Sequence, residues 1–189
     1  VWNCQSAGSP FTIPQLMEAC NLLTLNMVFL CETKNRKQVM EKLQKQLRFE
    51  KSLVVESMHK LGGMAVMWNT DVQVLEILTT AFTVEVHIMD TKTNLDWWSI
   101  EIFASTDEQI KKNQWEVVKR QKELWGLRWM ISSDCNDITS NEEKWRGRRR
   151  EEDSFKDFRN FINQNGLIDL GFEGNPWTWS NHWNQEGEI

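Results

Sequence analysis

Helical periodicity marks four segments of the chain. In each segment apolar residues recur every three to four positions, which is typical of a helix with one buried face. The four predicted helices cover residues 13–23, 36–47, 107–125 and 155–165. The apolar side of the third helix is expected to consist of Ile110, Val117, Val118 and Leu124. Gly166 is expected to end the fourth helix.

Shorter apolar runs between these helices predict strands. Compact runs at 27–31 and 128–132 are consistent with buried strands, and a short first strand is expected at 2–4. Five β-type runs separated by turn residues predict antiparallel hairpins; they cover 52–56, 63–68, 72–78, 82–89 and 97–104. The order is α/β, then a β meander, then α/β again. This order predicts an α/β fold of two packed sheets with helices outside.

Composition narrows the class of protein. The 189 residues are 40% apolar, enough to build a core, and no apolar run approaches the roughly 18–20 residues of a membrane span. No signal peptide is visible, so a nuclear or cytoplasmic location is expected. The net charge of −5 excludes a protein held to nucleic acid by overall basicity. The four cysteines have no CxxC spacing, which favours free thiols over a zinc site.

Two features of the composition suggest a cut or altered sequence. The chain begins at Val1 and stops at Ile189 without becoming more polar, so we expect a fragment. It contains eleven Trp and nine Phe but no Tyr, and its nine Gly are fewer than the roughly thirteen expected from average usage.

The candidate chemistry lies in acidic and amide residues at predicted strand ends. Asn3 closes the first strand, Glu32 follows the run at 27–31, and Asp134 and Asn136 follow the run at 128–132. Because residues two apart point to the same side of an extended chain, Asp134 and Asn136 are expected to share a face. Hard oxygen ligands of this kind suit Mg²⁺. The alternative is ordinary turn chemistry, since Asp and Asn favour such positions. His59, His87 and His182 stand alone and predict surface or core histidines.

Five blocks of the chain, in order, resemble endonuclease/exonuclease/phosphatase domains, and most closely those of plant LINE-type non-LTR retrotransposons. The blocks are 2–8 (WNCQSAG), 28–34 (VFLCETK), 62–68 (GGMAVMW), 133–138 (SDCNDI), and 167–172 (LIDLGF) with 177–181 (WTWSN). The resemblance covers essentially the whole chain. It implies a DNase I-like four-layer sandwich of two packed mixed β-sheets flanked by helices, with residues 1–189 forming a single, incomplete domain.

The resemblance also implies Mg²⁺-dependent phosphodiester hydrolysis, with Mn²⁺ as an alternative ion. Glu32 would be the main metal ligand, and Asn3 would assist at the metal or the phosphate. Asp134 would orient or deprotonate the attacking water, and Asn136 would bond a phosphoryl oxygen. The implied partners are DNA and a reverse-transcriptase domain downstream, and the implied activity is nicking of a chromosomal target.

Several positions depart from the family pattern. Phe103-Ala104 stands where the family has Tyr-Gly, so a phosphate-contacting hydroxyl is missing. Gln5-Ser6 replaces Arg-Gly, and Ser133 and Cys135 replace the Gly and Phe of Gly-Asp-Phe-Asn. The family ends with a Ser-Asp-His block, and this chain stops before one.

The substitutions at these positions are of types that would follow from C→T decay of a silenced element. Impaired activity is therefore expected, and an inactive relic that at most binds nucleic acid is the alternative. A phosphatase of the same superfamily is a second alternative.

Three residues are candidate substrate contacts. Arg146 lies in the basic stretch 144–150, which is interpreted either as a DNA-backbone contact or as a solvated loop balanced by the acids that follow. Trp179 and Asn181 lie in the last block. Trp177 and Trp179 are as likely to stack on bases as to pack, whereas Trp2, Trp68 and Trp98 lie in strand patterns that favour packing.

Overall fold

The computed structural model describes residues 1–4, 6–7, 12–56, 62–145, 147–171 and 173, with the backbone alone at residue 133. Within this part of the chain, no helix is both long and apolar enough to cross a membrane. The chain divides into two compact units: residues 1–105 with 121–135, and residues 106–120 with 136–189. The expectation of one domain over 1–189 stays a prediction.

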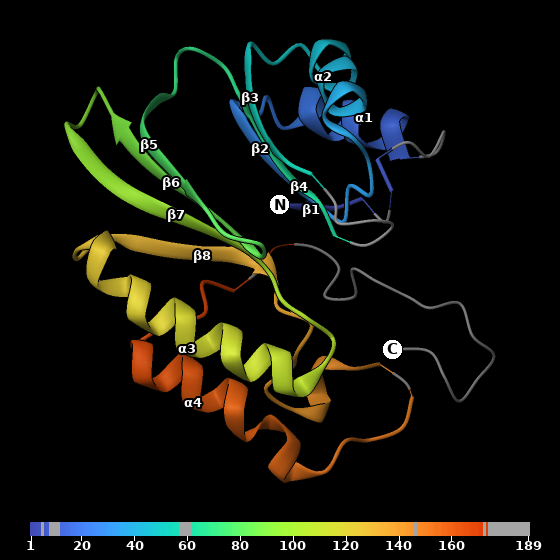
Figure 1. Ribbon diagram of the computed structural model, residues 1–189, viewed down its shortest axis with the longest axis vertical. Helices are drawn as coiled ribbons and strands as arrows, with labels where there is room; N and C mark the ends of the chain where they lie inside the picture. Colours follow the sequence, from blue (N-terminus) through green and yellow to red (C-terminus); the bar gives the residue numbers. More distant parts are fainter. Residues whose placement is uncertain (5, 8–11, 57–61, 146, 172, 174–189) are drawn as a thin grey trace. The chain divides into compact units, whose positions relative to one another are not determined.

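The first unit contains both sheets (Figure 1). The first sheet has the strand order β1-β2-β4-β3, with bounds Trp2–Asn3, Met27–Cys31, Met64–Trp68 and Lys51–Val55. The second sheet has the order β5-β6-β7-β8, with bounds Gln73–Thr79, Thr83–Asp90, Leu95–Phe103 and Trp129–Asp134. Each sheet is mixed, because the β1–β2 and β7–β8 pairs are parallel and all other pairs are antiparallel.

Alternation along these strands builds two apolar layers in the first unit. One layer lies between the first sheet and the helices α1 (Thr12–Leu22) and α2 (Lys37–Gln46); Leu16, Met40 and Leu30 are buried in it. The other layer lies between the two sheets and includes Phe29 and Val86. The strand β2 is buried on both faces, which explains its unbroken apolar run.

The last turn of α3 (Glu108–Trp125) lies against the outer face of the second sheet. There the indole Nε1 of Trp125 donates a hydrogen bond of 2.9 Å to Glu85 of β6. The two mixed sheets flanked by helices confirm the predicted α/β fold class.

The second unit holds the rest of α3, the short 3-10 helices η1 (Asn141–Glu143) and η2 (Glu152–Phe155), and α4 (Lys156–Asn165). Trp115 of α3 stacks on Phe161 of α4 at 4.4 Å between ring centroids. Gly166 caps α4 at a φ of 65°, in the left-handed region that glycine tolerates, so the predicted helix end is confirmed.

Two predictions about the elements are wrong. The five hairpin strands do not form one meander, because β3–β4 belong to the first sheet and β5–β7 to the second. The predicted face of α3 is wrong in part: Val118 is buried as predicted, but Ile110 and Leu124 are 53% and 62% exposed, and the other buried residues are Lys111, Trp115 and Trp125. Two tryptophans replace the expected aliphatic residues, and a lysine takes an internal position because its charge is paired there.

Candidate active site

Two predicted site residues from different sheets meet in the first unit. The carboxamide Nδ2 of Asn3, on β1, donates a 2.9 Å hydrogen bond to Oδ2 of Asp134, the last residue of β8. Asn3 is in register with Cys31, whose side chain lies in the layer between the sheets, and Asp134 is in register with Phe103. The hydrogen bond therefore joins the two sheets across their inner faces.

Glu32 follows β2 directly and is held in a tight backbone arrangement. Its carbonyl accepts from the N–H of Ser6 at 3.0 Å, and the N–H groups of Thr33 and Lys34 donate to the Gly63 and Gly62 carbonyls. The φ of Glu32 is 51° and that of Ser6 is 114°, both in the region that side chains other than glycine's rarely adopt. Strain at Glu32, the predicted metal ligand, is of the kind found at functional sites. Ser6 stands where the resemblance places a glycine, so its strain follows from the serine side chain.

The Glu32 carboxylate is half-exposed and pairs with the Lys34 ammonium at 2.9 Å. Lys34 was not assigned a role from the sequence. Both residues lie beyond the end of β2 with positive φ values, so strand alternation carried no signal for this pairing. The charge of Lys34 offsets that of Glu32 where a cation would otherwise do so.

Two buried thiols beside the candidate site have raised pKa values. Burial, together with nearby Asp134, Cys4 and Glu32, raises the pKa of Cys31 to about 12. Burial, with a smaller contribution from Glu32, raises the pKa of Cys4 to about 12. Both thiols therefore stay protonated near neutral pH, which excludes them as thiolate nucleophiles.

The donor set fits a hard divalent cation. The carboxylates of Glu32 and Asp134 and the amide oxygen of Asn3 are oxygen ligands, and Mg²⁺ takes one or two protein carboxylates while keeping several waters. Oxygen ligands of this kind suit Mg²⁺ or Mn²⁺ better than zinc. Among the described residues, no three His, Cys, Asp or Glu side chains form a ready-made metal cluster.

Glu101 is a buried acid at this site that was not predicted from the sequence. It lies on β7 in register with Ser132, two positions from the Phe103–Asp134 pair and on the same inner face. The side chain is 7% exposed, Oε1 accepts from the Ser99 hydroxyl at 2.9 Å, and Oε2 has no hydrogen-bond partner in the described part of the chain. Burial raises the pKa of Glu101 to about 7. Its alternating position in β7 resembles a solvent-facing one, so the sequence carries no signal for it.

The remaining predicted site residues lie in the second unit or outside the described residues. Asn136 begins the second unit and has a φ of 45°. β8 ends at Asp134, so the alternation of a strand does not reach Asn136, and the role of Asn136 stays a prediction. Arg146, Trp179 and Asn181 lie outside the described residues, as do His59, His182 and Trp177.

Two other polar places have structural explanations. His87 bonds Asp96 at 2.7 Å and stacks on Trp98 with 4.8 Å between ring centroids, consistent with a packed histidine.

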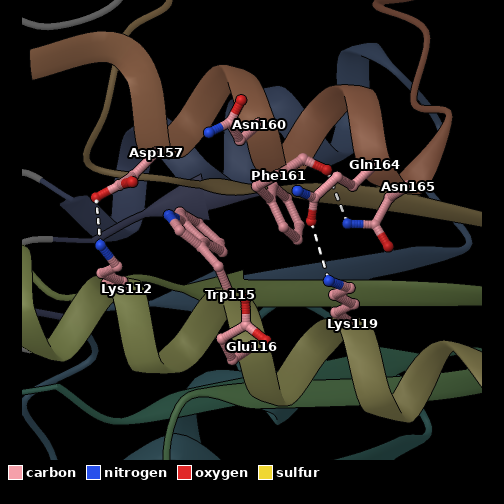
Figure 2. A pocket seen from close by; sticks show the side chains of 9 residues that line it. All are labelled: Lys112, Trp115, Glu116, Lys119, Asp157, Asn160, Phe161, Gln164 and Asn165. Atoms are coloured by element: carbon pink, nitrogen blue, oxygen red, sulfur yellow. Dashed lines mark hydrogen bonds and ion pairs between the residues drawn. The ribbon is translucent and has the colours of Figure 1, made fainter. Parts of the chain in front are cut away.

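A pocket of about 100 Å³ lies between α3 and α4 in the second unit (Figure 2). It is bridged by Lys112–Asp157 at 3.4 Å and by Lys119–Gln164 at 3.0 Å, and contains none of the predicted site residues.

No family profile and no curated protein matches the sequence. Solved structures do match the fold. The 3′ phosphatase NExo from Neisseria, bound to a product DNA hairpin, has a TM-score of 0.63 at 12% identity, over 86% of this chain and 68% of that chain. An endonuclease/exonuclease/phosphatase family protein from Bacteroides thetaiotaomicron has a TM-score of 0.60 at 10% identity, over 80% of this chain and 59% of that chain.

A third similar structure is the mannosyl-6-phosphatase Bt3783 of the same species, with a TM-score of 0.59 at 12% identity, over 81% of this chain and 67% of that chain. At identities this low the structural similarity establishes the fold alone, and it confirms the predicted DNase I-like fold. The chain spans 59% to 68% of the length of these three structures. Activity, substrate and partners are therefore a matter of proposal.

Proposed function

We propose that this chain is a Mg²⁺-dependent phosphodiesterase that nicks DNA, as in target-site cleavage by LINE-type retrotransposons, with impaired activity. The observation that carries the proposal is the Asn3–Asp134 hydrogen bond of 2.9 Å between the two sheets, with Glu32 at the end of the adjacent strand β2. Similar structures that include a 3′ phosphatase bound to DNA support a phosphoester substrate.

In this proposal each residue has a named task. Glu32 would hold the metal ion, and the amide oxygen of Asn3 would assist at the metal or the phosphate. Asp134, oriented by the amide of Asn3, orients the attacking water and accepts its proton. Asn136 donates to a phosphoryl oxygen. When bound, Mg²⁺ supplies positive charge that stabilises the phosphoryl oxygens as charge develops on them.

The departures from the family pattern support impaired activity. Phe103 lies in register with Asp134 but has no hydroxyl to offer a phosphate. Ser6 has a φ of 114° where the resemblance places a glycine. That strain favours the alternative of a decayed, inactive relic more than any other observation.

The test is conversion of supercoiled plasmid to open-circular DNA in Mg²⁺, with EDTA as the metal-free arm. Glu32→Ala and Asp134→Ala are each expected to slow nicking roughly 100-fold or more. Glu41→Ala, an exposed acid on α2 with the same charge change, should nick at the parent rate. Nicking that survives both site substitutions refutes the site, and a parent without activity supports the relic.

A phosphatase is the second candidate, because two of the similar structures are phosphatases. Release of inorganic phosphate from a 3′-phosphorylated oligonucleotide and from mannose 6-phosphate discriminates the two functions. Phosphate release without plasmid nicking would assign the same residues to phosphomonoester hydrolysis.

A further inference from the structure

The loop between η1 and η2 has a fixed base. We call residues 144–149 the basic loop; Arg146 within it is outside the described residues. Asn141 closes the loop with two hydrogen bonds, because its Nδ2 donates to the Arg150 carbonyl at 2.9 Å and its Oδ1 accepts from the Arg150 N–H at 2.8 Å. Inside the loop, the Lys144 ammonium donates to the Arg148 carbonyl at 2.8 Å.

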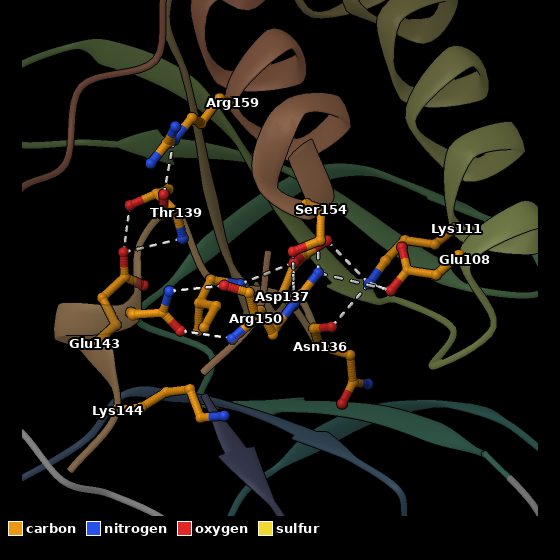
Figure 3. A network of polar contacts seen from close by, with 12 residues as sticks. Glu108, Lys111, Asn136, Asp137, Thr139, Glu143, Lys144, Arg150, Ser154 and Arg159 are labelled. Carbon is orange, nitrogen blue, oxygen red and sulfur yellow. Dashed lines mark hydrogen bonds and ion pairs between the residues drawn. The ribbon is translucent and has the colours of Figure 1, made fainter. Parts of the chain in front are cut away.

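The base of the loop is fastened to a buried charge network in the second unit (Figure 3). The Arg150 guanidinium bonds one carboxylate oxygen of Asp137 at 2.9 Å, and the Lys111 ammonium bonds the other at 2.9 Å. The side chains of Lys111 and Asp137 are each 3% exposed. Arg150 is therefore a structural residue that fixes the base of the loop, and a fixed base lowers the entropy cost of binding.

The basic loop presents an aromatic ring and two cations to solvent. Trp145 is 68% exposed, which is unusual for a side chain of this size. Arg148 and Arg149 are exposed, and neither forms an ion pair with another residue that the structure describes.

Two of the acids near the loop are already engaged. Glu143 accepts from the Thr139 N–H at 3.0 Å and from its hydroxyl, and Glu152 is paired with Arg159. The other nearby acids are exposed and offset the charge of the loop only in part; they are Glu142, Glu151 and Asp153.

We propose that the basic loop binds single-stranded DNA, with Trp145 stacked on an unpaired base and Arg148 and Arg149 on the neighbouring phosphates. An exposed aromatic ring beside guanidinium groups matches the alternation of base and phosphate along a single strand. A duplex hides its base faces, so the loop prefers single strands. The inference rests on the proposed function for its substrate class, but the binding needs neither metal nor hydrolysis.

The test is fluorescence anisotropy of a labelled 12-nucleotide DNA, as a single strand and as a duplex, in EDTA over a range of salt concentrations. Trp145→Ala should weaken single-strand binding roughly 5- to 150-fold, the range for losing one base stack, and change duplex binding less than about twofold. Arg148→Gln with Arg149→Gln should weaken both and reduce the salt slope for the single strand by roughly 1.4, for two lost phosphate contacts.

The matched control is Lys42→Gln with Lys45→Gln, which removes the same charge from exposed positions of α2 and should leave binding within about twofold. Equal effects of the loop and control pairs, or an unchanged affinity in Trp145→Ala, would overturn the proposal. Competition by polyaspartate as strong as by the oligonucleotide would also overturn it. Binding is measured in EDTA, where no hydrolysis takes place, so the two proposals can fail separately. A parent protein that binds the single strand but does not nick plasmid refutes the catalytic proposal alone. A parent protein that nicks plasmid but does not bind through the loop refutes the loop proposal alone.

Discussion

The second sheet buries one glutamate on each face, and the two glutamates differ in how their oxygens are satisfied. On the outer face, the Oε1 and Oε2 of Glu85 accept from the Thr83 hydroxyl and the Trp125 indole, both at 2.9 Å. On the inner face, Glu101 accepts from Ser99 through Oε1, and its Oε2 has no hydrogen-bond partner among the described residues.

This difference distinguishes Glu85, which has a structural role, from Glu101, which lies beside the candidate active site. Glu85 fastens the last turn of α3 to the sheet, so its cost of burial is offset by two hydrogen bonds. Glu101 shares its face with Asp134 and holds its charged form at a penalty, which is why burial raises its pKa to about 7. The buried charge of Glu101 therefore lowers stability on the inner face of the second sheet, which is the face of the proposed catalytic residue Asp134.

Glu101→Gln tests the inner half of this comparison and should have the largest effect on stability. The folded pKa of Glu101 is raised from 4.5 to about 7, so between these values the native state binds more protons than the unfolded state and stability falls as pH rises. The variant lacks this loss. Its free energy of unfolding relative to the parent should therefore rise by about 3 kcal/mol from pH 4 to pH 8.

Urea unfolding of parent and variant at several pH values measures that rise. Glu76→Gln, at an exposed position of the same sheet, is the control and should follow the parent. A difference between Glu101→Gln and the parent that is constant with pH would show that the buried carboxyl is not penalised.

Glu85→Leu tests the outer half, and its effect should have the opposite sign to that of Glu101→Gln. Leucine has no acceptor, so the buried indole N–H of Trp125 loses its acceptor, Oε2 of Glu85, and is left unsatisfied. The expected loss is about 2 kcal/mol in the free energy of unfolding at pH 7. Thermal unfolding followed by circular dichroism suffices, and an increase in stability would break the contrast between the two faces.

Ser6→Gly sharpens the comparison by separating backbone strain from buried charge at the candidate site. Ser6 has a φ of 114°, and glycine relieves that strain while keeping the N–H that bonds the Glu32 carbonyl. The expected gain is about 1 kcal/mol, independent of pH. Ser6→Ala is the matched variant and should show no gain; equal stabilities of the two variants would place the cost elsewhere.

Much of the fold could be predicted from local pattern. The apolar run at 27–31 is the strand β2, and the helix predicted at 36–47 is α2 with one residue fewer at each end. Periodicity failed for α3, because a buried lysine and two tryptophans replace aliphatic residues on its inner side. The burial of Lys111 can be understood only from its ion pair with Asp137, and that pairing is not visible in the local sequence.

The candidate site depended on non-local information even more. Asn3 and Asp134 are 131 residues apart, and spacing alone does not indicate that β1 and β8 meet across two sheets. The family resemblance assigned both residues to one active site, and the hydrogen bond between them is seen only in the structure. Neither Glu85 nor Glu101 was predicted, since acids alternating with apolar residues normally face solvent, and here both faces of the sheet are covered.

The central claim is that Asn3 and Asp134 work as one catalytic unit, and a double-mutant cycle on the plasmid-nicking rate tests it most directly. The account predicts that Asp134→Ala loses roughly 100-fold or more, and that Asn3→Ala costs clearly less in the Asp134→Ala background than in the parent, because residues that act together are non-additive. Losses that simply multiply, or an Asp134→Ala variant that nicks at the parent rate, would contradict it.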